Sequence, residues 1–330
     1  MFDIYKLNLQ LFAELNTNVT TQTGVGQDLS AENKTFYDMN LIDEATPNLI
    51  HDQFGQKRPI PKNGGKRIEF RKFASLPKAT TPLTEGVTPD GKKLSVSTIE
   101  AEVAQYGDYI VQSDVLELTS IDNTIVEATK ILGNQAGLTL DTITRNVLHS
   151  GTNVYYCPKA DGTAVSTRSG LDNTCKLTVD VIKRCVAFMK KNNAPKINGD
   201  YVAIIHPFVA YDLMSDPAWI EAHKYATPEN IYEGEIGKVA GVRFVESSEA
   251  KVYDEEVFGT LLIADGAYGV TEITGGGLQT VIKQLGSAGT ADPLNQRSSI
   301  GWKAIKTAEI LVEPYLMRIE SKSAISAEEN

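Results

Sequence analysis

Few residues in this chain combine the types and the spacing that chemistry requires. The stretch from Gly86 to Lys93 has the glycine and lysine spacing of a phosphate-binding loop. It lacks the Ser or Thr that would hold Mg²⁺, contains a proline and leads into a predicted strand instead of a helix. We therefore interpret this stretch as a turn at the tip of a hairpin and predict no phosphate site there.

The cysteines and histidines form no recognisable catalytic or metal-binding pattern. Cys157, Cys175 and Cys185 are 18 and 10 residues apart, and His206 follows after 21, without the C-x-x-C pair of common zinc sites. We predict that His206 is satisfied at a strand end and that His149 has a charge–dipole interaction at a helix C-terminus. The sequence thus predicts no catalytic, cofactor-binding or metal-binding residues and gives no reason to classify the protein as an enzyme.

Composition and charge narrow the class of protein further. The 330 residues, of which 42% are hydrophobic and 22% charged, suffice for a sizeable core in two domains or in one domain with long excursions. The formal net charge of −10 argues against a basic surface that grips nucleic acid. An odd number of cysteines, three, favours a reducing compartment. No apolar run reaches 18 residues and the N-terminus does not resemble a signal peptide, so we expect no membrane span.

A long helix is predicted from about Ile121 to His149. Ser120 and Asp122 offer side-chain acceptors to the free N–H groups at its start. Its apolar residues are spaced three, four or seven apart, which is typical of one buried stripe. The predicted stripe consists of Leu118, Ile121, Ile125, Leu132, Ala136, Leu140, Ile143 and Val147.

Two glycines interrupt this helix, Gly133 and Gly137. Each costs about 1 kcal/mol against alanine, so we expect a neighbouring element to pack closely there. On this segment alone, a core helix of an α/β enzyme is an equal alternative. The segments that flank the helix favour a different class of protein.

Residues 58–112 predict a long β-hairpin with an irregular tip. Ile68 and Phe70 alternate with charged residues between Arg67 and Arg71, and a stretch rich in Pro, Thr and Gly separates this strand from a second β-prone run. Neither strand carries many large apolar residues, so the hairpin cannot stabilise itself in water. We expect it to lie on a surface of its own chain or of a neighbour.

Three further segments complete the chain. Residues 1–57 are polar and rich in Thr, Asn and Gly, which indicates an extended arm. Residues 178–265 predict a compact mixed α/β unit whose first helix is capped by Thr178. Residues 266–330 are rich in strands that we expect to return and cover the long helix. The first helix of the α/β unit is predicted to bury Val181, Ile182, Cys185, Val186 and Met189.

Four motifs occur in order along the chain: LTEGVTPDG at 83–91, AQYGDYIVQSDVLELTS at 104–120, YEGEIGKVAGVRFVES at 232–247 and DPLNQRSSIGWKAIKTAEIL at 292–311. Together they resemble the major capsid proteins of tailed bacteriophages over almost the whole chain. The resemblance implies an α+β fold, the tailed-phage major capsid fold. This fold has an N-terminal arm, an extended β-hairpin loop, a peripheral domain with a long spine helix and an axial α/β domain. The corresponding segments are 1–57, 58–112, 113–177 with 266–330, and 178–265.

The same resemblance implies a major capsid protein. Such a protein self-assembles as hexamers and pentamers into the icosahedral shell of the virion, around the double-stranded DNA genome of a tailed phage. It would be made in the cytoplasm of the host bacterium. The alternative is the shell protein of a cellular encapsulating nanocompartment, which has the same fold and encloses an enzyme cargo.

The expected partners are other copies of the chain, a separate scaffolding protein and a portal, with DNA as non-specific content and no membrane. A separate scaffolding protein is expected because the arm, 1–57, is shorter than the cleaved scaffolding region of many relatives. The candidate inter-subunit residues are Arg67, Arg71, Lys92 and Lys93. They give the hairpin a basic character that suits the acidic remainder of a neighbour.

Overall fold

A computed structural model of the chain describes Thr17, Asn18 and residues 50–325, except residues 64, 74–75, 84, 89, 121–123, 224–236, 273, 275–276 and 288. Most of the predicted arm and the proposed cap Asp122 therefore lie outside the described residues. The chain divides into two compact units. Boundaries between the units fall inside helix α2 (Thr124–His149) and strand β14 (Arg297–Ile310). The first unit is built mainly from Tyr106–Ala136 and Leu278–Ala304, and the second from Pro47–Gln105, Gly137–Gly277 and Ile305–Asn330.

The sheet of the first unit is centred on β5 (Ala104–Ser113) and the first part of β14. β13 (Gln279–Lys283) pairs antiparallel with β14, and β1 (Thr17–Asn18) pairs parallel with β5. A Cβ on Gly301 would lie 2.8 Å from the carbonyl oxygen of Asp108. Only glycine therefore allows β5 and β14 to approach this closely.

Two helical segments belong to the first unit. Helix α1 (Asp114–Thr119) follows β5 directly, because the hydroxyl of Ser113 accepts a hydrogen bond from a backbone N–H of its first turn at 3.2 Å. The first part of α2 is held to the strands by the side chain of Gln135. This amide accepts from the indole N–H of Trp302 at 3.2 Å and donates to the carboxylate of Asp108 at 2.7 Å.

The second unit contains a sheet of seven described strands in the order β6-β15-β11-β7-β9-β8, with β10 beside β11. All seven residues of β11 (Val257–Ile263) are buried, as expected for a strand that is covered on both faces. β11 pairs antiparallel with β15 and β7, and β7 pairs parallel with β9. The other strands are β6 Val154–Tyr156, β7 Tyr201–Ile205, β8 Lys238–Val239, β9 Val242–Glu246, β10 Val252–Tyr253 and β15 Leu316–Ser321.

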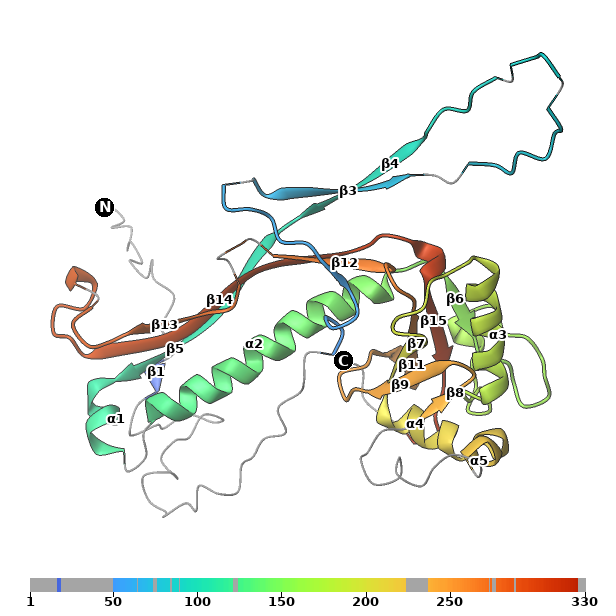
Figure 1. The fold of residues 1–330 in the computed structure, drawn as a ribbon. Helices are drawn as coiled ribbons and strands as arrows, with labels where there is room; N and C mark the ends of the chain where they lie inside the picture. Colours follow the sequence, from blue (N-terminus) through green and yellow to red (C-terminus); the bar gives the residue numbers. More distant parts are fainter. Residues whose placement is uncertain are drawn as a thin grey trace, which may run out of the picture. The chain divides into compact units, whose positions relative to one another are not determined.

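Three helices pack on this sheet: α3 (Val179–Lys191), α4 (Pro207–Met214) and α5 (Pro217–His223) (Figure 1). Successive side chains of β7 point to opposite faces of the sheet and so enter two different cores. Ala203 packs in the core that contains these helices, and Ile204 packs in the core that contains Leu148 of α2. Short 3₁₀ helices complete the described elements: Arg168–Gly170, Asp254–Glu256, Gly289–Ala291 and Glu313–Tyr315.

The sequence signals of this α/β region are confirmed. Thr178 caps α3, all five residues predicted on its inner face are buried, and Lys190 and Lys191 occupy its last turn. Pro207 is the first residue of α4, and the ring nitrogen Nδ1 of His206 accepts from a backbone N–H of that helix at 3.2 Å. His206 is thus satisfied at a strand end, as predicted.

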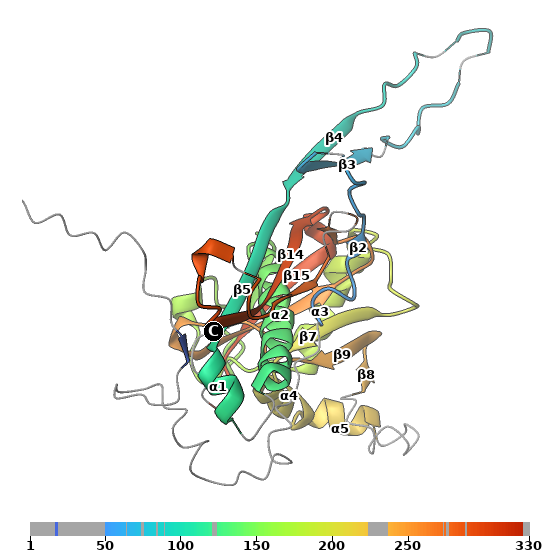
Figure 2. The ribbon, with the colours of Figure 1, turned by 90° about the vertical axis from the view of Figure 1, so that its left-hand side faces the viewer.

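A long hairpin and two further strands also belong to the second unit. Strands β3 (Arg67–Phe73) and β4 (Val96–Glu102) pair antiparallel, from Arg67 opposite Glu102 to Phe73 opposite Val96. The loop that joins them continues past the strand ends in both views (Figures 1 and 2). β12 (Tyr268–Glu272) pairs antiparallel with the end of β14 and parallel with β2 (Gln56–Lys57).

The long helix is confirmed, but the predicted stripe is only partly correct. Leu118 belongs to α1 and is 84% exposed, and Val147 is only half-buried. Beyond Leu140 the buried face of α2 becomes mainly polar, because side chains from other segments bond to it. The buried residues of α2 are Ala128, Leu132, Ala136, Leu140, Asp141, Thr144, Arg145, Leu148 and His149.

Two further expectations about α2 are wrong. A Cβ on Gly133 or Gly137 would meet no described atom within 4 Å, so no described element packs closely against these glycines. The predicted charge–dipole role of His149 is also wrong. Its ring is buried, and its Nδ1 atom shares a hydrogen bond with the hydroxyl of Tyr253 at 2.9 Å. Burial, together with the charges of neighbouring basic groups, lowers the pKa of His149 well below 6.5, so the ring is neutral at pH 7.

A pH dependence of stability follows. Below pH 6.5 the unfolded chain protonates residue 149 and the folded chain does not, so the free energy of unfolding decreases as the pH falls from 7 to 5. In His149→Asn we expect this pH slope to decrease by up to about 1.4 kcal/mol per pH unit. Urea unfolding of the unassembled protein at several pH values measures the slope, and equal slopes for the two proteins would contradict the prediction.

Candidate assembly surface and its anchor

The four candidate inter-subunit residues lie on two different parts of the hairpin. On β3, Arg67 forms an ion pair with Glu102 at 3.3 Å, and Arg71 forms one with Glu69 at 3.3 Å. All four of these side chains are about half exposed or more, so each pair contributes little stability. The strands therefore already balance the charge of both arginines with acids of their own.

The two lysines stand apart from this paired region. Lys92 and Lys93 lie on the loop between β3 and β4, are exposed and form no ion pair with any described residue. The structure therefore does not gather the four basic residues into one patch. Of the four, the lysines of the loop are the ones whose charge is available to another molecule.

The same loop exposes large apolar side chains, which the sequence reasoning did not single out. Leu83 and Leu94 expose 77% and 70% of their surface, and Leu76 and Val87 also expose more than half. The described residues of this loop form no strand or helix. Isolated exposed leucines are common on protein surfaces, but several on one extended loop are typical of a binding segment.

The hairpin follows a short segment, residues 50–57, that is called the root here and is held by the buried residue His51. The carboxylate of Asp141 on α2 accepts two hydrogen bonds from His51, one from its backbone N–H at 2.8 Å and one at ring nitrogen Nδ1 at 2.6 Å. The hydroxyl of Tyr268 donates to the carbonyl oxygen of His51. His51 is completely buried, and its Nε2 atom has no described hydrogen-bond partner.

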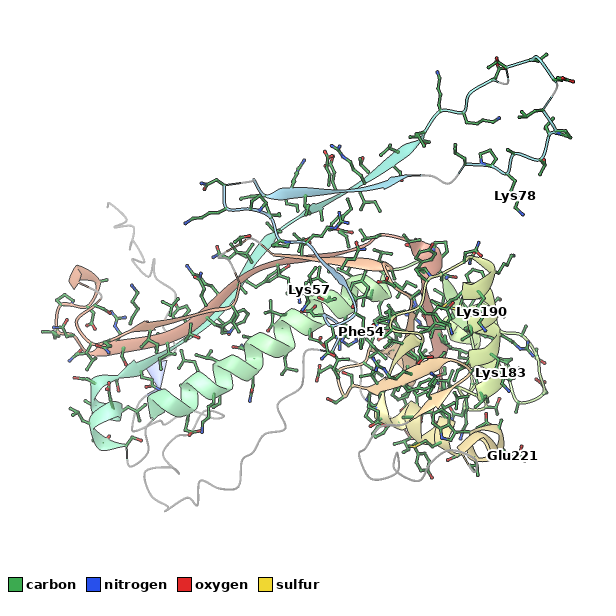
Figure 3. The ribbon with its side chains drawn as sticks, in the orientation of Figure 1. Phe54, Lys57, Lys78, Lys183, Lys190 and Glu221 are labelled. Atoms are coloured by element: carbon green, nitrogen blue, oxygen red, sulfur yellow. The ribbon has the colours of Figure 1, made fainter. Side chains whose placement is uncertain are left out.

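The next residue of the root makes a second set of buried contacts. The carboxylate of Asp52 accepts from the hydroxyl of Thr144 at 2.6 Å and forms an ion pair with Lys306 of β14. Lys306 also donates to the carbonyl oxygen of Leu140 at 2.9 Å. Phe54 of the root packs against the core that contains Leu148 (Figure 3). The root is therefore fixed to α2, β12 and β14 by charges as well as by apolar contacts.

Two further charged contacts involve the buried side chains of Arg145 on α2 and Glu320 on β15. Burial lowers the pKa of Arg145, and the negative charges of Glu249 and Asp141 act in the opposite direction. The guanidinium of Arg145 donates a hydrogen bond to the carbonyl oxygen of Glu249 at 2.7 Å. Glu320 of β15 is completely buried and accepts two hydrogen bonds from Arg168, at 2.8 and 2.7 Å. These bonds raise the pKa of Arg168, so its guanidinium stays charged.

The anchor residues were missed at the level of sequence, although a signal existed. On α2, Thr144 and Arg145 lie three and four residues after Asp141, a spacing that places the three side chains on one helix face. A polar group inside an otherwise apolar stripe indicates buried partners. The sequence does not identify those partners, because His51, Asp52 and Lys306 are distant in the chain.

The described residues contain neither a metal-binding cluster nor a helix that could span a membrane. They contain no group of three or more His, Cys, Asp or Glu side chains that could hold a metal ion. The three cysteines are buried and free, and burial raises the pKa of Cys185 to about 12. Within the described part of the chain, no helix is long and apolar enough to cross a membrane.

Comparison with models of protein families assigns the chain to one of them. A family model described as phage capsid protein matches residues 20–265. The chain belongs to the phage capsid protein family. No curated protein sequence matches it. Its function is therefore that of a phage major capsid protein, a structural protein of the virion capsid.

Solved structures agree with the fold of this capsid protein. The capsid of cyanophage P-SCSP1u has a TM-score of 0.68 at 15% identity, over 88% of this chain and 93% of that chain. The capsid of Ralstonia phage GP4 has a TM-score of 0.67 at 15% identity, over 94% of this chain and 100% of that chain. The tailed-phage capsid fold predicted from the sequence is thus confirmed.

A structure from the alternative class is also similar. The holo-SrpI encapsulin complex from Synechococcus elongatus PCC 7942 has a TM-score of 0.56 at 10% identity, over 92% of this chain and 98% of that chain. This likeness reflects the fold that the two classes share. The family match favours the phage capsid protein over the nanocompartment.

The buried ion pair at the root leads to a prediction about stability. Lys306→Met leaves the carboxylate of Asp52 buried without its counter-charge, which we expect to lower the free energy of unfolding by about 3 kcal/mol. Lys303→Met removes an exposed lysine from the same strand and is expected to cost less than about 0.5 kcal/mol. Urea unfolding measures both values.

A double variant separates the charge from the packing. Asp52→Asn combined with Lys306→Met removes both charges, so we expect it to recover part of the lost stability. If Lys306→Met and Lys303→Met have equal effects, the ion pair does not anchor the root.

Proposed function

We propose that this capsid protein assembles as hexamers and pentamers into a closed icosahedral shell, in which the hairpin of each subunit lies across the adjacent subunit. The observation that supports this proposal is the loop of the hairpin. Its leucines are largely exposed in the single chain, and a two-stranded hairpin gains little stability from itself in water. Burial of these side chains on a neighbour would remove apolar surface from water at every contact of the ring.

We propose that the segments divide the work of assembly. Residues 1–57 act as an arm and 58–112 as the extended loop. Residues 113–177 with 266–330 form the peripheral domain around the spine helix, and 178–265 form the axial domain. The axial domains then meet at the centres of hexamers and pentamers.

The partners of the shell follow from the same proposal. A scaffolding protein guides closure, a portal occupies one vertex, and the shell encloses double-stranded DNA. The net charge of −10 suits this content, because an acidic wall does not bind packaged DNA tightly. In this proposal the subunits are synthesised in the cytoplasm of the host bacterium.

Electron microscopy and sedimentation of the expressed protein, alone and with a candidate scaffolding protein, test the proposal. Closed shells, tubes or ring-shaped capsomers are the expected products. A monodisperse monomer or dimer under every condition would overturn the proposal. Shells from infected cells that contain an enzyme cargo instead of DNA would favour the nanocompartment.

The exposed lysines of the loop provide a specific prediction. Lys92→Glu with Lys93→Glu reverses the charge that faces the acidic neighbour, so we expect assembly to decrease at least about tenfold while the monomer stays folded. Lys62→Glu with Lys66→Glu changes the net charge equally outside the tip, and it is expected to have a smaller effect. Light scattering measures assembly and circular dichroism the fold; an unfolded tip variant would contradict the prediction.

A further inference from the structure

A cavity lies at the base of the hairpin in the second unit. Its volume is about 210 Å³, and it is lined by the hairpin strands, by the root and by the residues that follow β14. Phe70 and Ile99 are paired across the hairpin at this position. The apolar lining comes from Phe70, Ile99, Leu311 and Val312.

Among the described residues, an unpaired arginine gives this cavity a positive charge. Arg58 and Arg71 both line it, and both are exposed. Arg58 forms no ion pair with any described residue, and Arg71 is paired with Glu69 on the same strand. An apolar cavity with one cationic group, Arg58, that is unpaired within the described residues suits a ligand that combines an apolar side chain with a carboxylate.

The tip of the hairpin carries such a combination. Leu83 and Val87 expose 77% and 63% of their surface, and Glu85 lies between them in the sequence, exposed and without an ion-pair partner among the described residues. Gly86 adopts a φ of +77° in the turn that presents Glu85. Leu83, Glu85 and Val87 are hereafter the acidic tip.

We propose that the acidic tip of one subunit docks in the cavity at the base of the next subunit's hairpin, with Glu85 beside Arg58. This inference rests on the proposed assembly and names the surface that receives the hairpin. Charge complementarity and the matching apolar groups support a second copy of the chain as the occupant.

A subunit cannot fill its own cavity in this way. The cavity lies beside the Phe70–Ile99 pair, whereas the strand ladder continues to the Phe73–Val96 pair and the loop leaves from there. The loop, which carries Lys78, extends beyond the strand ends (Figure 3). A tip and a cavity at different places on one chain form a heterologous contact, which generates rings when the rotation between subunits closes.

Charge reversal tests the contact. Glu85→Arg and Arg58→Glu each place like charges together, so each should reduce assembly at least about tenfold. The double variant, with both changes in one chain, restores opposite charges at every contact and should assemble within about threefold of the wild type. Asp90→Arg is the matched control, since it changes the net charge of the same loop equally outside the acidic tip.

Mixing the two single variants gives a sharper result. A Glu85→Arg subunit has a positive tip and a positive cavity, and an Arg58→Glu subunit has a negative tip and a cavity with one cation replaced by an anion. Only alternating neighbours match, so the mixture should form six-membered rings, which permit alternation, but not five-membered rings, which forbid it. We therefore expect rings or tubes without closed shells under the electron microscope.

The outcomes separate this inference from the proposed function. If the wild type assembles and Glu85→Arg or Arg58→Glu assembles equally well, only the docking site is wrong. A double variant without rescue would also overturn it, provided that circular dichroism shows each variant folded. If the wild type forms no rings or shells, the proposed assembly fails and the docking site fails with it.

Discussion

The ion pair between Asp52 and Lys306 is the constraint on which the assembly surface depends. It joins the root of the hairpin to β14, while Asp141 holds the adjacent His51 against α2. A hairpin with few apolar contacts has little stability of its own, so its direction is set by what holds its base. The buried charges at the root therefore determine where the exposed loop begins.

Polar anchoring has a physical consequence that apolar packing lacks. Burial of an ion pair contributes little net stability, since desolvation offsets most of the attraction. A displaced root, however, would leave the carboxylates of Asp52 and Asp141 buried and unpaired, which costs several kcal/mol. Apolar side chains tolerate small shifts, whereas these bonds define one position. The anchor thus supplies accuracy in the placement of the hairpin more than it supplies stability.

Local patterns in the sequence predicted the parts of the fold that local physics decides. The cap at Thr178, the buried face of α3 and the length of α2 all follow from spacing within one segment. The polar half of α2 was not predicted, because its partners, including His51 and Lys306, are more than 80 residues away in the chain. The paired state of Arg67 likewise depends on strand register, which places Glu102 opposite it.

An anchored base and an extended loop also fit the geometric demand of the proposed shell. In the proposed shell, six- and five-membered rings need different rotations between neighbours, so a single contact has to serve both. In the hairpin, the ladder that ends at Phe73 and Val96 keeps its register, while the described residues beyond it form no regular structure. In the proposed assembly, such a loop would absorb the difference in rotation without disturbing the anchored root. Side-chain contacts at the tip can then stay the same in both rings, because the backbone between base and tip adjusts instead.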